Sequence, residues 1–193
     1  KTQHNPPWNR LILRDNTMID EKRKKEAHSN FARYLQEGLL KKENSELAKN
    51  KYIENADISL KTAQELMQNP IKPYLWVIVT SYYSMFYMAN AILLNYGYKT
   101  QDKIVHKVTS EALIVLVLNK LKKELLEDYE TIQKDALEIA NIKAEYIVES
   151  YALELDKRSR FQYNMLEQTK ENKAQTSLKR ASEFVFEMKK LLN

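Results

Sequence analysis

The segment that most constrains the fold is 74–94, YLWVIVTSYYSMFYMANAILL, which contains no charged side chain in a chain where 30% of the residues are charged. It is long enough to cross a bilayer as a helix, and it is equally suited to be the central helix of a soluble bundle. Two features favour the bundle, because a membrane span concentrates its tyrosines at its two ends and keeps polar groups out of its middle. The polar and tyrosine side chains near the middle of the segment are Thr80, Ser81, Tyr82, Tyr83, Ser84, Tyr87 and Asn90.

The composition predicts a single all-α domain. A chain of 193 residues can bury a full core, and with 2 Gly and 4 Pro it has few turn signals, so long helices with short connections are expected. The absence of Cys excludes disulfides, thiol catalysis and zinc–cysteine sites, and it agrees with a cytoplasmic protein. Residues 1–18 have no apolar core of the length that a secretion signal needs. The net charge of +5 permits an anionic partner, although a lysine-rich solvated surface is the commoner reason for such a balance.

Three regions are expected along the chain: an extended arm over 1–17, an additional N-terminal helix within 18–45, and a helical bundle over 46–193. Asn44-Ser45 offers a break and a new N-cap, and the prolines of Asn69–Pro73 form the strongest break. Apolar residues at alternating spacings of three and four predict the helices. The first three helices are expected over 19–40, 46–68 and 74–96. A fourth helix is expected to hold Leu113, Leu116, Val117, Leu121 and Leu125. A long helix is expected over 129–162, and a last helix from about Asn172.

The helix at 74–94 is apolar on every side, so it must be covered on every side. A monomeric bundle of this size is expected to struggle to cover it entirely, and a homodimer formed along one flank is the natural solution. The residues expected at that interface are Tyr82, Tyr83, Phe86 and Tyr87.

A candidate anion site lies late in the long helix. Its apolar stripe is expected to run through Leu137, Ala140, Ala144, Ile147, Tyr151 and Leu155. Positions 137, 144 and 151 repeat every seven residues, and the next member of the series is Arg158. A guanidinium on that face must meet a carboxylate, a carbonyl or a cleft. An anion-binding or RNA-facing role is one interpretation, and a structural salt bridge or a helix end that emerges into water is the other. With Lys157, Lys170 and Lys173, this end of the bundle is expected to be positive.

Four segments, in order, resemble the HEPN domain (the higher eukaryotes and prokaryotes nucleotide-binding domain). SYYSMFYMANAILLNYGY is similar to the tyrosine-rich second helix of its prokaryotic form, and KYIENADISLKTAQELMQN resembles the helix before it. KRSRFQYN is similar to an Arg-x-x-Ala-x-Tyr signature late in the fold, and KRASEFVFEMKKLL resembles the closing helix. The resemblance covers about 46–192 and implies an antiparallel helical bundle that usually dimerises; the helix at 19–40 and the arm before it are less typical of the family.

Many HEPN domains are ribonucleases built on an Arg and a His that are separated by four to six residues. The Arg steadies the phosphate and the His is the acid–base group. This chain departs from that pattern, because its histidines are His4, His28 and His106, and the residue five after Arg158 is Tyr163. An unperturbed tyrosine, with a pKa near 10, is a poor base at neutral pH. The resemblance therefore predicts nucleotide or RNA association without the usual cleavage, with no catalytic residue assigned. The binding residues that it implies are Lys157, Arg158, Arg160 and Tyr163.

Other site chemistry is not expected. The chain has no Glu-x-x-His pair for a di-iron site, and with Gly38 and Gly97 as its only glycines it cannot form a glycine-rich phosphate loop. No metal and no cofactor are therefore predicted. His106 is expected to be a surface or capping residue near the start of a helix.

Three functions remain open from the sequence. The first is a homodimeric nucleotide- or RNA-associated protein, which the family suggests is paired with a small nucleotidyltransferase as a toxin–antitoxin couple. Tyr163 is then the candidate for modification, although the modified tyrosine of the family lies where this chain has Met165. The second is a ribonuclease with a non-standard acid–base group, built from Arg158, Tyr163 and His106 across a dimer. The third is a protein-interaction module, for which the basic run 22–25 is either a docking surface or a solvated helix start.

Overall fold

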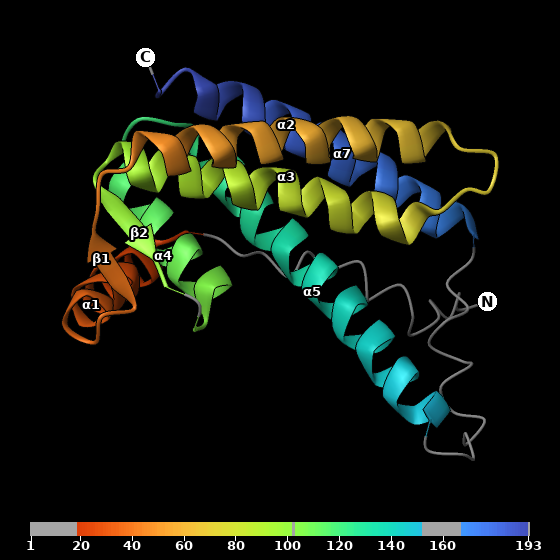
Figure 1. Ribbon diagram of the computed structural model, residues 1–193, viewed down its shortest axis with the longest axis horizontal. Coiled ribbons are helices and arrows are strands. Elements are labelled where there is room, and N and C mark those ends of the chain that lie inside the picture. The colour runs from red at the N-terminus through yellow and green to blue at the C-terminus, as the bar shows by residue number, and fades with distance from the viewer. Residues whose placement is uncertain (1–18, 102, 152–166, 193) are drawn as a thin grey trace, which may run out of the picture.

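The computed structural model describes residues 19–101, 103–151 and 167–192, which form six helices and a two-stranded ribbon (Figure 1). The expected all-α bundle with an additional N-terminal helix is confirmed. The elements, in chain order, are α1 Glu21–Gln36, β1 Leu40–Lys42, α2 Glu46–Gln68, α3 Tyr74–Asn95, β2 Tyr98–Thr100, α4 Val105–Val117, α5 Lys123–Tyr151 and α7 Glu167–Lys189.

The helix starts and breaks follow local sequence chemistry. The Ser45 side chain caps α2 by accepting a hydrogen bond from the Ala48 backbone N–H, as its position in the sequence predicts. Asp20 caps α1 in the same way by accepting from the Arg23 backbone N–H. The Asn69–Pro73 break is also confirmed, because α2 ends at Gln68 and α3 begins at Tyr74. The turn between them contains Lys72 at φ 54°.

The centre of the molecule is α3. It forms an antiparallel hairpin with α2, lies beside α7, and also contacts α4 and α5 (Figure 1). Of its most apolar 18-residue window, 83% is buried within this one chain. Five other elements pack around it, and one stripe of the helix stays partly exposed, so the described part of the chain covers most of α3 but not all of it. By length and composition α3 could cross a membrane, but a largely buried core helix passes the same test.

Three polar side chains of α3 have hydrogen-bond partners inside the bundle, whereas the buried Ser81 hydroxyl has none among the described residues. Ser84 and Thr80 donate back to carbonyls of their own helix, at 2.7 Å in both cases. Asn90 donates to the Phe86 carbonyl at 2.9 Å and accepts from the Thr100 hydroxyl at 2.8 Å, so it ties α3 to β2. Buried polar groups paired in this way stabilise one particular arrangement of the helices around α3.

The additional helix α1 packs against α4 at one end of the bundle, where β1 and β2 also lie (Figure 1). The two strands are antiparallel, with Leu40 opposite Thr100. Gly38 and Gly97 precede the two strands at φ 69° and 79°, a conformation that glycine adopts without strain. The sequence analysis did not predict this ribbon, because strands of three residues carry too short a pattern to be seen.

Several of the expected helix boundaries are wrong, among them the start of the long helix, which is Lys123 rather than Tyr129. The first helix ends at Gln36 rather than Leu40, because the turn at Gly38 leads directly into β1. The helix that was expected to carry Leu113 through Leu125 ends at Val117, and α5 begins at Lys123. Leu125 therefore belongs to α5, where it is buried against the core.

Candidate functional site

The binding residues predicted from the sequence, Lys157, Arg158, Arg160 and Tyr163, lie outside the described residues and remain predictions. The apolar stripe that led to Arg158 can be compared with the structure at Leu137 and Ala140. Leu137 is half-buried against the core, but Ala140 is exposed. The prediction for Ala140 is therefore wrong. The fully buried face of α5 is made by a neighbouring set of residues, Leu125, Leu126, Tyr129, Ile132 and Ala136.

One face of α3 is left partly uncovered by the other described elements. Trp76, Thr80, Tyr83 and Tyr87 follow one another at spacings of four, three and four, and Trp76 is 50% exposed. Two residues expected at the dimer interface, Tyr83 and Tyr87, lie on this stripe. The other two face the interior, since Tyr82 is fully buried and Phe86 is 8% exposed. We call Trp76, Thr80, Tyr83 and Tyr87 the α3 stripe.

His106 is not the surface or capping residue that the sequence predicted. It lies in the first turn of α4, half-buried among aromatic side chains of α3. Its ring centroid is 4.6 Å from that of Phe86 and 5.5 Å from that of Tyr82. The Tyr82 hydroxyl oxygen lies 2.7 Å from His106 Nδ1. The prediction is wrong because α4 packs its first turn against α3, and this packing cannot be seen in the sequence of α4 alone.

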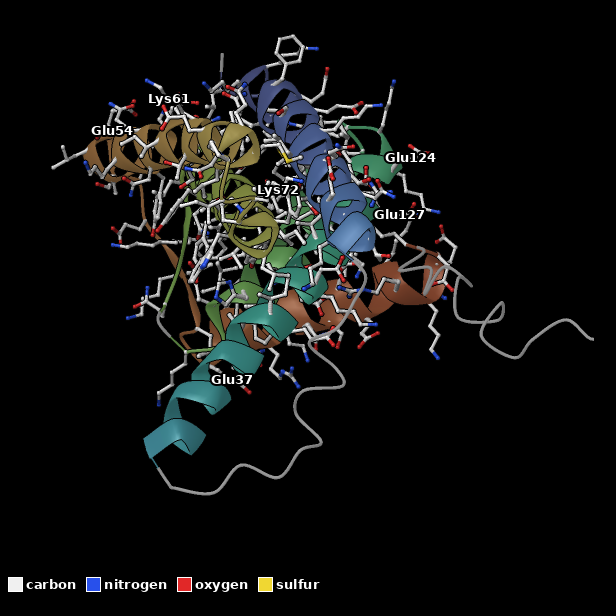
Figure 2. The ribbon with its side chains drawn as sticks, turned by 90° about the vertical axis from the view of Figure 1, so that its right-hand side faces the viewer. Glu37, Glu54, Lys61, Lys72, Glu124 and Glu127 are labelled. Atoms are coloured by element: carbon white, nitrogen blue, oxygen red, sulfur yellow. The ribbon has the colours of Figure 1, made fainter. Side chains whose placement is uncertain are left out.

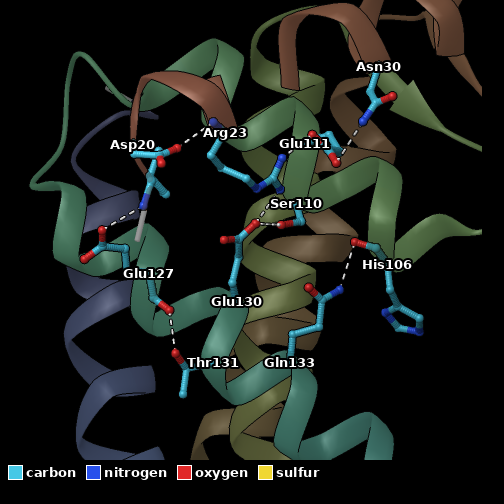
Figure 3. Close-up of polar contacts among 11 residues, drawn as sticks. Asp20, Arg23, Asn30, His106, Ser110, Glu111, Glu127, Glu130, Thr131 and Gln133 are labelled. Atoms are coloured by element: carbon cyan, nitrogen blue, oxygen red, sulfur yellow. Dashed lines mark hydrogen bonds and ion pairs between the residues drawn. The ribbon is translucent and has the colours of Figure 1, made fainter. Parts of the chain in front are cut away.

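Hydrogen bonds hold the His106 ring in place. Gln133 Nε2 of α5 donates to the His106 backbone carbonyl at 2.9 Å (Figure 3), and because a carbonyl only accepts, the amide orientation of Gln133 is fixed. The same nitrogen donates to the Tyr82 hydroxyl oxygen at 3.2 Å. The Tyr82 hydroxyl and His106 Nδ1 share one further hydrogen bond, so Nδ1 is occupied in either tautomer of the imidazole.

The environment keeps both groups of this pair neutral. Burial lowers the pKa of His106 below its usual value, because the apolar surroundings disfavour the imidazolium. Burial also raises the pKa of the Tyr82 hydroxyl far above the physiological range. His106 is therefore neutral at neutral pH, and its Nδ1 is not available to a ligand because Tyr82 occupies it.

Beside His106, a charge cluster joins the additional helix to the rest of the bundle (Figure 3). Arg23 of α1 extends between two carboxylates, with Nη1 2.7 Å from Glu111 Oε2 and Nη2 2.6 Å from Glu130 Oε1. The other Glu111 oxygen accepts from Asn30 Nδ2, and Glu130 Oε1 also accepts from the Ser110 hydroxyl. The glutamates are almost fully buried, with side chains 4% and 11% exposed. The cluster thus satisfies two buried charges with one guanidinium.

Arg23 belongs to the basic run 22–25, which was predicted from the sequence to be a docking surface or a solvated helix start. Both interpretations are wrong for Arg23, because its side chain is directed inward; Lys24 pairs instead with Glu21 on the surface. The spacing of residues along α1 could have predicted that Arg23 faces inward. Arg23 lies four residues before Ala27 and eleven before Tyr34, both fully buried, so all three share one face of α1.

These two groups of residues border an open cleft of about 530 Å³ between α1, α4 and α5. Its walls carry polar and charged side chains from all three helices, with Ile104 and Leu137 as the apolar part. The polar and charged lining residues are Arg23, His106, Lys107, Ser110, Glu111, Glu130, Gln133 and Lys134.

The backbone is strained at the edge of this cleft. Ile104, the N-cap residue of α4, has φ 46° and ψ 31°, a left-handed conformation that a β-branched residue adopts at a cost of about 1 to 2 kcal/mol. Its side chain is 54% exposed, so apolar burial offsets little of that cost. Strained residues of this kind gather at ligand sites, where the surrounding structure holds them in place.

Within the parts of the chain that the structure describes, no group of three or more His, Asp or Glu side chains is arranged to hold a metal ion.

Comparison with known families gives one match: residues 50–191 correspond to the HEPN domain. No curated protein and no solved structure matches the chain. The matched range includes α3 to α7 and most of α2, and it leaves α1 and β1 outside. Arg23 therefore comes from an element added to the family domain, whereas His106, Glu111 and Glu130 belong to the domain itself.

Proposed function

Because the chain belongs to the HEPN domain family, we propose that it is a homodimeric, nucleotide- or RNA-associated cytoplasmic protein that binds its ligand without cleaving RNA. The family supports the ligand class, since HEPN domains are generally associated with nucleotide binding or with ribonuclease activity. The proposal that binding is retained and cleavage is lost rests on the acid–base groups of this particular chain.

The observation that carries the proposal is the missing histidine of the family motif, because the position five residues after Arg158 holds Tyr163. Cleavage of RNA through its 2′-hydroxyl requires a base that accepts the proton of that hydroxyl. Of the described histidines, His28 is exposed on α1, and His106 is half-buried with its Nδ1 bonded to Tyr82. Neither of them stands in the motif that supplies the base in the family.

The dimer proposed here uses the α3 stripe. Its exposed aromatic side chains, above all Trp76, form a line along the central helix that the described part of this chain leaves partly open. Aromatic residues of this kind are enriched in the cores of protein interfaces. A second copy that packs the same stripe against it would form a self-complementary interface.

A small nucleotidyltransferase is the proposed protein partner, as in the toxin–antitoxin couples of the family, with Tyr163 as the candidate for modification. A gene for such an enzyme beside this one would support the pairing, and co-expression would test it directly. Mass spectrometry of the co-expressed protein should find a nucleotide adduct on Tyr163. An unmodified tryptic peptide in the presence of an active transferase would count against this assignment.

The central experiment is a titration of the purified protein with ATP and with labelled single-stranded RNA, for the wild type and for Arg158→Ala. We expect binding of at least one ligand by the wild type and weaker binding by the variant, because the guanidinium would no longer pair with phosphate. The same RNA, incubated without metal and separated on a denaturing gel, should remain intact. Cleavage that is lost in Arg158→Ala would replace this proposal with the alternative of a ribonuclease that uses a non-standard acid–base group.

Binding of neither ligand by a well-folded dimer would refute the proposed function and favour a purely protein-interaction role.

A further inference from the structure

We propose that RNA binds through its phosphate backbone to a basic surface at the end of the bundle where α1, β1, β2 and the start of α4 lie. Six exposed lysines define this surface, which we call the basic end: Lys22, Lys25, Lys41, Lys42, Lys103 and Lys107. The inference rests on the proposed function for the class of ligand. It goes further by choosing RNA, by assigning backbone contacts to described residues, and by giving the additional helix α1 a role in binding.

The net charge of the chain is concentrated in two short segments. Residues 19–43 and 98–108 contain ten Lys or Arg and six Asp or Glu, which gives a net charge of +4. All other residues together contain 21 Lys or Arg and 20 Asp or Glu, which gives a net charge of +1. Less than a fifth of the chain therefore carries four of its five net positive charges.

The fold brings these two segments together, although they lie far apart in the sequence. α1 contacts both β1 and α4, and β2 likewise contacts β1 and α4. Figure 1 shows the four elements at one end of the bundle, away from the turn that joins α2 to α3. The positive charge of the two segments is therefore gathered over one part of the molecule, where it can act on a single ligand.

The lysines of the basic end differ from those of α2 in their ion pairs. None of the six makes an ion pair with another described side chain. On α2, by contrast, each lysine pairs with a glutamate of the same helix, and the pairs are Lys49–Glu46, Lys51–Glu54 and Lys61–Glu65. The ammonium groups of the basic end can therefore bind phosphate oxygens without first breaking an ion pair of the protein.

The ribbon places two lysines directly opposite each other. Lys41 of β1 is in register with Lys99 of β2, and like charges at opposed positions destabilise an antiparallel pair. Lys99 has a partner in Glu43, at 2.8 Å, whereas Lys41 makes no ion pair among the described residues. A bound phosphate would relieve this repulsion, so the arrangement suits the binding of a polyanion better than it suits the stability of the ribbon.

The basic end lacks the apolar face with which an amphipathic helix enters a membrane surface. The apolar side chains of α1 are buried or packed against the core, and they are Ala27, Phe31, Tyr34 and Leu35. What α1 presents to solvent is therefore charge without an apolar anchor. Exposed lysines on several elements suit a strand whose negative charges repeat along its length, and contacts of this kind to phosphates carry no sequence preference.

The test compares two double variants of the basic end with a matched control that removes the same charge elsewhere. The substitutions are Lys22→Gln with Lys25→Gln in α1, Lys41→Gln with Lys42→Gln in β1, and, as the control, Lys61→Gln with Lys179→Gln in α2 and α7. Figure 2 shows Lys61 on the surface of α2, and all six lysines are exposed, so each variant should keep the fold. Each protein is titrated with labelled single-stranded RNA at several salt concentrations, with ATP, and with phosphatidylserine vesicles.

We expect each double variant of the basic end to weaken RNA binding and to reduce its salt dependence. Each phosphate contact to a single strand contributes about 0.7 to the slope of log K against log salt, so the loss of two contacts should make the slope about 1.4 shallower. With equal affinities at about 1 M salt, that change corresponds to roughly 25-fold weaker binding at about 0.1 M salt. The control should bind RNA like the wild type, and the vesicles should not bind.

A second readout separates binding from stability. The β1 variant should melt at the temperature of the wild type or above it, because it removes the repulsion between Lys41 and Lys99 while it weakens RNA binding. A lower melting temperature would show that Lys41 serves the ribbon itself and would contradict its assignment to RNA.

The outcomes separate this inference from the proposed function. If RNA binds, loses affinity in Arg158→Ala and keeps its affinity and salt slope in both variants, the proposed function stands and the basic end is not the site. Binding of ATP without RNA would have the same meaning. Binding of vesicles in place of RNA, lost in the variants, would assign the basic end to a membrane surface and overturn the inference. If the wild type binds neither RNA nor ATP, both the inference and the proposed function are overturned.

Discussion

Replacing Arg23 should destabilise the protein far more than replacing any lysine beside it. Its guanidinium contacts Glu111 at 2.7 Å and Glu130 at 2.6 Å, and these carboxylates have side chains only 4% and 11% exposed. Arg23→Met keeps much of the apolar stem and removes the charge, so both carboxylates lose their cation while they stay buried. Stranding a buried ionic partner in this way costs about 3 to 5 kcal/mol.

The cost at this site should lie below that range, because the Arg23 side chain is 22% exposed and the adjoining cleft lets water reach the carboxylates. Asn30 and Ser110 also keep their hydrogen bonds to the two glutamates. We therefore expect a loss of about 2 to 3 kcal/mol in the free energy of unfolding. For a chain of this length that corresponds to a melting temperature roughly 4 to 12 °C lower.

Urea denaturation followed by circular dichroism measures the loss, and the neighbouring Lys24→Met is the matched control. Lys24 pairs with Glu21 on the surface, where the two side chains are 38% and 80% exposed, so its replacement should cost under about 0.5 kcal/mol. In the background Glu111→Gln, Glu130→Gln, the effect of Arg23→Met should fall below about 1 kcal/mol, because no buried carboxylate is left without a cation. An equal effect of the Arg23 and Lys24 substitutions, or an unchanged Arg23 effect in that background, would refute the reasoning.

Three further predictions concern the α3 stripe, His106 and Ile104. Tyr83→Glu places a charge on the stripe and should convert the proposed dimer to a monomer in light scattering, whereas a dimer that persists would place the interface elsewhere. The lowered pKa of His106 means that its contribution to stability is fully present above its unfolded-state pKa near 6.5 and declines as the pH falls below that value. The free energy of unfolding should therefore fall between pH 8 and pH 5, and it should fall less in His106→Phe. An equal fall in the two proteins would contradict the lowered pKa of His106. Ile104→Gly removes the left-handed strain at φ 46° and should raise the unfolding free energy by about 1 kcal/mol in the same urea assay, whereas a loss would show that the side chain contributes packing.

The sequence predicted the helical architecture well because the signals for it are local. The Ser45 cap, the Asn69–Pro73 break and the three-four spacing of apolar residues each act within one or two helical turns. The absence of charge over 74–94 also identified the central helix correctly. The extent to which the bundle covers this helix could not be predicted, because periodicity gives the apolar faces of a helix without giving the number of neighbours that the fold places around it.

The candidate cleft could not be predicted in the same way. It brings together Arg23, His106 and Gln133 from three helices, and the contact between Tyr82 and His106 depends on how α4 packs against α3. The inward direction of Arg23 could have been predicted, since its spacing from Ala27 and Tyr34 places it on the buried face of α1. The burial and hydrogen bonding of His106 could not be predicted, because they depend on residues of two other helices.

The most direct test of the central claim is a titration of the wild-type protein with ATP and with labelled single-stranded RNA, in buffer without detergent, with the RNA recovered and sized afterwards. The account predicts that a dimeric protein binds at least one of the two ligands and leaves the RNA intact. Saturable binding of neither ligand, or metal-independent cleavage of the RNA, would contradict it.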